Sequence, residues 1–149
     1  MTVEVIAVDT SYDGTVAASG RRPWLIASWP PAMVARLDSA ILALPIFAEA
    51  EIRAGWLKGE FSEKRIAIEE TRLSRYLRAP FDPKVIAAWT ELHAAGRRNG
   101  WNAGDNDLWI AATALSRGWP VVSCDHDFKR ILHPDLEVIH LDVGTKPAS

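Results

Sequence analysis

The hydrophobic residues of this 149-residue chain fall into short apolar runs separated by longer, more polar segments. The runs are VEVIAVD (3–9), AILALPIF (40–47), PVVSCD (120–125) and LEVIHLD (136–142). Nearly continuous apolar runs of this length are typical of strands in a parallel sheet that is buried on both faces. Because the runs alternate with helical segments, we predict an α/β fold with a central parallel sheet of four or five strands.

The segments between these runs carry signals that begin and end helices. Residues 48–60 are rich in helix-forming side chains, and further helices are expected over 62–78, 82–96 and about 106–117. A serine or an aspartate stands at the first position of the helices at 62–78 and 82–96, where its side chain can cap the helix, and glycines at 96 and 118 are expected to stop helices. Residues 19–32 contain three prolines, so we expect a loop and a poorly defined helix there.

The length and composition describe one globular domain. We predict a single domain over residues 1–142 and a flexible C-terminal tail over 143–149. The chain is 48% hydrophobic and 24% charged, and no apolar stretch approaches the roughly 20 residues that cross a bilayer. The single cysteine and the lack of a signal-peptide pattern fit a cytoplasmic protein. A net charge of −2 argues against a protein that holds nucleic acid through its overall field.

Acidic residues from distant parts of the chain are predicted to meet at one edge of the sheet. Asp9 follows the first strand, and Asp125 follows the run at 120–125 that we read as the third. Glu51 lies in the helix after the second strand, and Asp107 lies in the first turn of the helix at 106–117. Residues just past the carboxyl ends of parallel strands share one edge, where open α/β folds bind ligands. Clustered carboxylates repel one another and need protons or cations, and Mg²⁺ suits an all-oxygen set.

Each acid alone also has a simpler explanation. Asp107 would favour any helix N-terminus through the helix dipole, and Asp125 could be an ordinary turn or cap residue. Glu51 alone reads as part of a solvated helix face, whereas Asp9 is harder to explain this way because it ends a buried strand. The joint placement of the four is what predicts a metal site.

The same segments carry a resemblance to a known family. The pieces VIAVDTS, AEAEIRAGW, NDLWIAATALSRGWPVVS and CDHDFKRI have the order and spacing found in PIN-domain ribonucleases. The chain resembles in particular the toxin half of VapBC-type toxin–antitoxin pairs, over nearly its whole length. The resemblance implies a PIN-like three-layer α/β/α fold around the central sheet, with residues 1–142 as a single PIN-like nuclease domain. The resemblance implies a catalytic and metal-binding site at Asp9, Glu51, Asp107 and Asp125, with Asp127 replacing or assisting Asp125. It implies Mg²⁺ or Mn²⁺ as the cofactor.

The resemblance further implies a metal-dependent endoribonuclease that cleaves RNA phosphodiester bonds and is inhibited by a cognate antitoxin protein. It implies a homodimer as well. Trp56 and the helix at 62–78 are candidates for lining a groove that takes an antitoxin helix. Basic pairs at 21–22, 97–98 and 129–130 are candidates for contacts with RNA phosphates. The alternative is a catalytically inactive PIN-like module that binds RNA or protein.

Some neighbours of the four acids have their own predicted places. Glu49 is also acidic, but Glu51 matches the family position before the segment IRAG. Ser11 stands where the family usually has asparagine, and Ser123 could supply a hydroxyl near the site. His126 is expected to face solvent rather than to bind metal, because the other candidate ligands are all oxygen donors.

Overall fold

In the computed structural model, which describes residues 2–148, the chain forms one five-stranded sheet. The strand order is β3-β2-β1-β4-β5, and every neighbouring pair is parallel. The strands are β1 (Val5–Val8), β2 (Ile41–Pro45), β3 (Leu77–Ala79), β4 (Val121–Ser123) and β5 (Val138–His140). The predicted α/β fold with a parallel sheet is confirmed. Met1 and Ser149, the outer ends of the predicted domain and tail, lie outside the described residues.

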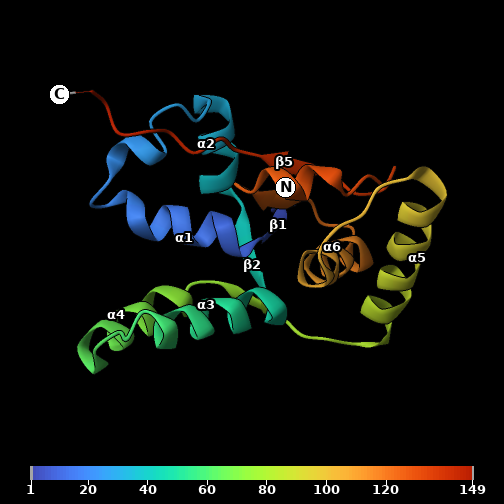
Figure 1. The fold of residues 1–149 in the computed structure, drawn as a ribbon, viewed down its shortest axis with the longest axis horizontal. Helices are drawn as coiled ribbons and strands as arrows, with labels where there is room; N and C mark the ends of the chain where they lie inside the picture. The colour runs from blue at the N-terminus through green and yellow to red at the C-terminus, as the bar shows by residue number, and fades with distance from the viewer. Residues whose placement is uncertain (1, 149) are drawn as a thin grey trace.

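Helices enclose this sheet (Figure 1). α5 and α6 pack against each other on one side of the sheet, and α1 lies on the other side, next to α3 (Figure 1). The predicted three layers are therefore present. The helices are α1 (Thr10–Ser19), η1 (Pro23–Leu25), α2 (Pro31–Ser39), α3 (Ile46–Lys58), α4 (Glu63–Leu73), α5 (Pro83–Asn99), α6 (Asp105–Arg117) and η2 (His126–Arg130), of which η1 and η2 are short 3₁₀ helices.

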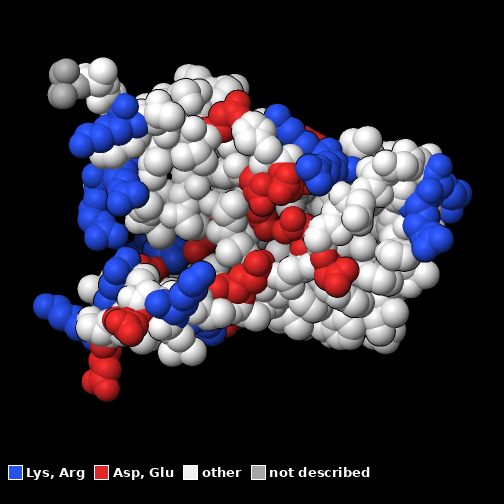
Figure 2. Space-filling model, in the orientation of Figure 1, with Lys and Arg blue, Asp and Glu red and all other residues white. Residues whose placement is uncertain are grey.

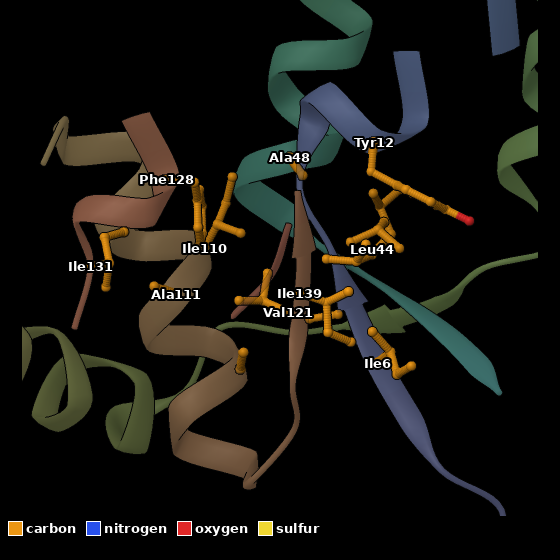
Figure 3. Close-up of a cluster of buried hydrophobic side chains, with 14 of the residues drawn as sticks. Ile6, Tyr12, Leu44, Ala48, Ile110, Ala111, Val121, Phe128, Ile131 and Ile139 are labelled. Carbon is orange, nitrogen blue, oxygen red and sulfur yellow. The ribbon is translucent and has the colours of Figure 1, made fainter. Parts of the chain in front are cut away.

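The core lies on both faces of the strands, as the apolar runs predict (Figure 3). Ile6 of β1 and Val121 of β4 are fully buried, and Ile139 of β5 is 4% exposed. Ile110 and Ala111 of α6 are also fully buried and lie in the same cluster (Figure 3). Burying an aliphatic side chain of this size stabilises the fold by roughly 1.5–3 kcal/mol. The packing therefore fixes the ends of the strands, and with them the residues that follow.

The helix predicted over 62–78 is shorter than expected. It begins as predicted, because the hydroxyl of Ser62 accepts the backbone N–H of Arg65 at 3.2 Å. α4 ends at Leu73, however, and the chain then turns into β3, which pairs with β2 at the edge of the sheet. Leu73 is fully buried, whereas Leu77 is 45% exposed. The segment predicted as one helix therefore belongs to two different elements.

Two further boundaries differ from the predictions. α5 runs through Gly96 and ends before Gly100, whose φ of 77° lies in the left-handed region that favours glycine. A side-chain carbon at Gly96 would lie 2.7 Å from the carbonyl oxygen of Trp101, so this glycine is needed for packing and not for stopping the helix. Residues 19–32 hold η1 and the regular start of α2, with Pro31 as its first residue.

Residues 143–148 form no helix or strand, as predicted for the tail. The segment is nonetheless attached to the fold, because the N–H of Gly144 donates to the carbonyl of Leu25 at 2.9 Å. The boundary at residue 142 and the flexibility of the tail stay predictions. In the described part of the chain, no helix has the length and apolar character that spanning a membrane requires.

A candidate acidic metal centre at the sheet edge

The predicted acids lie where the parallel strands end. Asp9 follows β1 directly, and Asp125 follows β4, the neighbour of β1. β2 and β3 lie on one side of β1, and β4 and β5 lie on its other side. The connections between strands therefore diverge between β1 and β4. Open α/β sheets bind ligands at such a switch point. Figure 2 shows acidic side chains gathered near the middle of this face, over the region where β1 and α6 lie in Figure 1.

Asp107, in the first turn of α6, interacts with all the other candidate acids. Burial raises the pKa of Asp107, and four neighbouring carboxylates raise it further, to about 6. In decreasing order of effect these are Asp9, Asp125, Glu51 and Asp127. Among the described residues, no group of three side chains that includes Asp107 or one of these four acids brings its ligand atoms within 4.8 Å of one another. The structure thus places the predicted acids around Asp107, but not close enough for three of them to hold one ion without side-chain movement.

Asp9 is the most deeply buried of these acids, with 2% of its surface exposed. Burial raises the pKa of Asp9, and the hydroxyl groups of Ser11 and Ser123 oppose that rise by hydrogen bonding. Both hydroxyls donate to the Oδ2 oxygen of Asp9, at 2.6 Å and 2.9 Å. Hydrogen bonds of this kind replace water that a buried carboxylate has lost, and they also fix its orientation. The predicted hydroxyl of Ser123 is therefore in place, and Ser11 contacts Asp9 directly.

The same two serines tie the end of β1 to the segment after β4. The hydroxyl oxygens of Ser11 and Ser123 lie 3.2 Å apart. Ser11 accepts the backbone N–H of Cys124 at 2.9 Å, and Ser123 accepts that of Asp125 at 3.0 Å. Asp125 in turn accepts the N–H of Asp127 at 2.9 Å and so caps η2. Asp125 therefore caps η2 and also lies at the acidic centre.

Glu51 and Glu49 of α3 are distinguished by their partners. Both oxygens of Glu49 are engaged by arginines, Oε2 by Arg53 at 2.8 Å and Oε1 by Arg78 at 2.6 Å. Among the described contacts, Glu51 accepts one side-chain hydrogen bond, from the hydroxyl of Thr10 at 2.7 Å. Glu51 is also exposed. The prediction of Glu51 over Glu49 agrees with this geometry, since only Glu51 remains available to a cation.

The residues after Asp125 divide between core and solvent. Phe128 is fully buried, as expected of an aromatic residue that anchors the turn. The side chains of Asp127 and His126 are 67% and 73% exposed, and Asp127 lies 3.4 Å from Arg130. His126 thus faces solvent, as predicted, and Asp127 lies at the rim of the centre.

Known proteins resemble this chain in both sequence and fold. The profile of a family described as "PIN domain" matches residues 30–133. "Ribonuclease VapC2" of Haemophilus influenzae is 36% identical over 84 residues, which make up 56% of this chain and 64% of that protein. "Ribonuclease VapC5" of Mycobacterium tuberculosis is 32% identical over 100 residues, or 62% of this chain and 73% of that protein.

Solved structures extend the likeness to nearly the whole chain. VapBC2 from Rickettsia felis, bound to a DNA fragment from its promoter, superimposes with a TM-score of 0.72 and 25% identity, over 93% of this chain and 99% of the other. VapBC-5 from Mycobacterium tuberculosis, a member of the VapBC family of toxin-antitoxin systems, superimposes with a TM-score of 0.66 and 26% identity, over 92% and 98%. These similarities cover the N-terminal elements that precede residue 30 as well as the matched segment.

Proposed function

The chain belongs to the PIN domain family, and on that premise we propose that it is a metal-dependent endoribonuclease that acts as the toxin of a toxin–antitoxin pair. The observation that carries the proposal is the set of carboxylates around Asp107, which adds to the effect of burial in raising the pKa of that residue to about 6. Relatives named as ribonucleases and neighbours named as toxin–antitoxin complexes support it. No observation favours the alternative of an inactive PIN-like binding module, because the acidic set is complete.

The donor atoms of the centre fit Mg²⁺ or Mn²⁺. Asp9, Glu51, Asp107 and Asp125 offer carboxylate oxygens alone, which hard divalent ions prefer. Burial and four neighbouring carboxylates together raise the pKa of Asp107, and a bound cation would oppose both effects. Asp127 is more exposed and would assist from the rim. Once bound, such an ion supplies an activated water molecule and positive charge at the scissile phosphate.

The chain's own residues would keep the metal ligands in position. Ser11 and Ser123 both donate to the Oδ2 oxygen of Asp9 and so fix the orientation of its carboxylate toward the centre. Thr10 holds Glu51 through a hydrogen bond of 2.7 Å. RNA phosphates are repelled by an acidic centre that has no cation, so the substrate would bind productively only after the metal. Basic side chains at 129–130, just beyond the rim, would hold neighbouring phosphates.

Cleavage of a single-stranded RNA by the purified protein tests this proposal. We expect cleavage in Mg²⁺, its loss in excess EDTA, and a rate lower by orders of magnitude for Asp9→Asn, which keeps the shape but removes the charge. Glu49→Gln is the matched control, because Glu49 lies on the same helix as Glu51 but is paired with arginines. Equal cleavage in EDTA, or full activity of Asp9→Asn, would contradict the proposal.

A groove between α1, α3 and α4 is the proposed site for the antitoxin. Its volume is about 510 Å³, and its floor is mainly apolar, with Ile52, Trp56 and Phe61 among the lining residues. Thr10 and Glu51 line it as well, so the groove reaches the acidic centre. The predicted roles of Trp56 and of the helix after residue 62 fit this geometry. An amphipathic segment could bury its apolar side chains here and direct an arginine toward the carboxylates.

Filling this groove tests the antitoxin site without touching the acids. Gly55 lines the groove, and a side-chain carbon added there meets nothing within 4 Å. Gly55→Leu should therefore fold normally, weaken binding of the protein encoded by the adjacent small open reading frame by at least tenfold, and leave RNA cleavage in place. Gly20→Leu is the control, since Gly20 also has free space but does not line the groove. Unchanged affinity in Gly55→Leu would place the antitoxin elsewhere.

The proposal also includes a homodimer and a cytoplasmic location. Sedimentation of the purified chain alone tests the dimer, which should dissociate only on dilution. An RNA substrate is met in the cytoplasm. The single cysteine, Cys124, is buried and unpaired in the structure, which fits the reducing conditions there.

A further inference from the structure

A second group of potential metal ligands lies outside the acidic centre. His126, His140 and Asp142 each direct one ligand atom into a common space, and these atoms all lie within 4.8 Å of one another. The Nε2 atom of His140 lies 3.0 Å from the Oδ1 oxygen of Asp142, and the Nε2 atom of His126 lies 3.5 Å from the same oxygen. The centroids of the two imidazole rings lie 4.7 Å apart. We propose that these three side chains form a second metal site, selective for a borderline ion such as Zn²⁺.

The spacing of the ligand atoms fits a tetrahedral ion. Zinc binds histidine nitrogen and carboxylate oxygen at about 2.0–2.1 Å, which separates neighbouring ligand atoms in a tetrahedron by about 3.3 Å. The separations of 3.0 Å and 3.5 Å from Asp142 bracket that value. An ion could therefore enter after small side-chain rotations, with water in the fourth position.

The donor atoms also set this group apart from the acidic centre. Two imidazole nitrogens suit Zn²⁺ and similar transition ions, whereas the carboxylates around Asp107 suit Mg²⁺ and Mn²⁺. The hydrogen bond from His140 lowers the pKa of Asp142, which keeps that carboxylate ionised and able to bind a cation. The two sites therefore differ in the metal that each prefers.

The fold holds two of the three ligands in place before any ion binds. His140 is the last residue of β5 and is paired in register with Ser123 of β4, and its side chain is 10% exposed. The carbonyl of Asp142 accepts the indole N–H of Trp29 at 2.9 Å. His126 is the first residue of η2 and is 73% exposed. The exposed carboxylate of Asp142 contacts His140 at 3.0 Å, so most of the ordering on binding falls on His126.

An ion at this position would connect η2 to the end of β5. His126 follows Asp125 directly and precedes Asp127, so the same short helix carries a ligand of each site. Fixing η2 would also restrict the backbone that positions Asp125. The second ion would therefore stabilise the loop of the acidic centre without taking part in its chemistry, and its binding does not depend on whether the protein cleaves RNA.

Cobalt(II) is a suitable probe, because tetrahedral Co²⁺ absorbs visible light far more strongly than six-coordinate Co²⁺. The full chain is titrated with Co²⁺ in excess Mg²⁺, which occupies the all-oxygen centre, and Zn²⁺ is then added to displace the probe. We expect one equivalent of strongly absorbing Co²⁺ in the native protein. His126→Ala and Asp142→Asn should each weaken binding at least about tenfold, since even the loss of an outer-shell partner commonly costs that much.

The controls separate loss of a ligand from loss of the fold. His126 and Asp142 are 73% and 71% exposed, so both variants should keep the metal-free melting temperature of the native chain. His93→Ala is the matched control, because His93 is an exposed histidine that stacks on Trp89 instead of joining the group. It should bind Co²⁺ like the native protein. The proposal is overturned if the native chain shows no strong absorption, or if His126→Ala and Asp142→Asn bind Co²⁺ as tightly as His93→Ala. In either case the three side chains form only a hydrogen-bonded surface group.

Discussion

Replacing Asp107 by asparagine distinguishes a metal ligand from a residue that merely favours a helix N-terminus. The change keeps the shape of the side chain and removes one negative charge from the centre. If Asp107 only interacts with the helix dipole, the variant loses about 0.3–1 kcal/mol of stability at every pH where the carboxylate is ionised. If burial and the neighbouring carboxylates destabilise its charged form, the metal-free variant gains stability instead.

The size of this gain follows from the pKa of Asp107, which is about 6 against an ordinary value of 3.8. The difference is about two units, or about 3 kcal/mol at 1.36 kcal/mol per unit. Because Asp107 is partly exposed, solvent screening reduces this to about 1–2 kcal/mol. A carboxyl group with a raised pKa contributes most stability below its unfolded pKa and loses it as the pH rises through about 6. The asparagine variant does not suffer this loss.

We therefore expect metal-free Asp107→Asn to be more stable than the native chain at pH 8 by about 1 kcal/mol, after the helix-dipole loss is subtracted. That corresponds to a rise of about 2–4 °C in melting temperature for a chain of this size. The gain should shrink at pH 5, where the native carboxyl is largely protonated. Cleavage in Mg²⁺ should fall by orders of magnitude.

Urea unfolding in EDTA at pH 5 and pH 8 measures these differences. Asp105→Asn is the matched control, because Asp105 is an exposed acid at the start of the same helix. A loss of stability at pH 8, or an equal gain in the Asp105 variant, would refute the argument for Asp107 as a member of the acidic set.

Two other substitutions test the supports of the centre. Ser123→Ala removes the buried hydroxyl that donates to Asp9 and accepts the N–H of Asp125, so urea unfolding should show a loss of about 1–3 kcal/mol, together with slower cleavage. Arg72→Met leaves Asp13, which is 1% exposed, without its arginine partner, and thermal or urea unfolding should show a loss of about 3–5 kcal/mol. A change below about 0.5 kcal/mol in either variant would contradict the role assigned to that side chain.

The strands and the acids at their ends could be predicted because their signals are local. β1, β2, β4 and β5 all lie in apolar runs, and parallel pairing alone brings Asp9 and Asp125 to one edge. β3 gave no such signal, because its sequence, Leu-Arg-Ala, is not an apolar run and its place depends on pairing with β2. α1 was also missed, since the buried Asp13 looks like a surface residue until Arg72 and Tyr76 are brought to it by the fold.

The same reasoning explains which candidate site residues could be predicted. Asp107 was predicted because it lies in the first turn of a helix that the sequence indicates. Glu51 was predicted because it matches a family motif. The separation of Glu51 from Glu49 by ion pairs with Arg53 and Arg78 needed the structure. A local pattern cannot show which distant side chains will meet across a sheet.

The histidine group illustrates this limit most clearly. In the sequence, His140 does not stand at a spacing from other histidines that is typical of metal ligands, and His126 was expected to face solvent. The two rings approach each other only because β4 and β5 pair with Ser123 opposite His140.

The most direct test of the central claim is the chemistry of the RNA ends, measured in water enriched in ¹⁸O. An acidic metal centre that activates water should leave a 5′-phosphate that carries one ¹⁸O atom and a free 3′-hydroxyl. Both products should disappear in EDTA and in Asp9→Asn. A 2′,3′-cyclic phosphate without ¹⁸O would show that the RNA's own 2′-hydroxyl attacks, and it would contradict the account of the acidic centre as a site for metal-assisted hydrolysis.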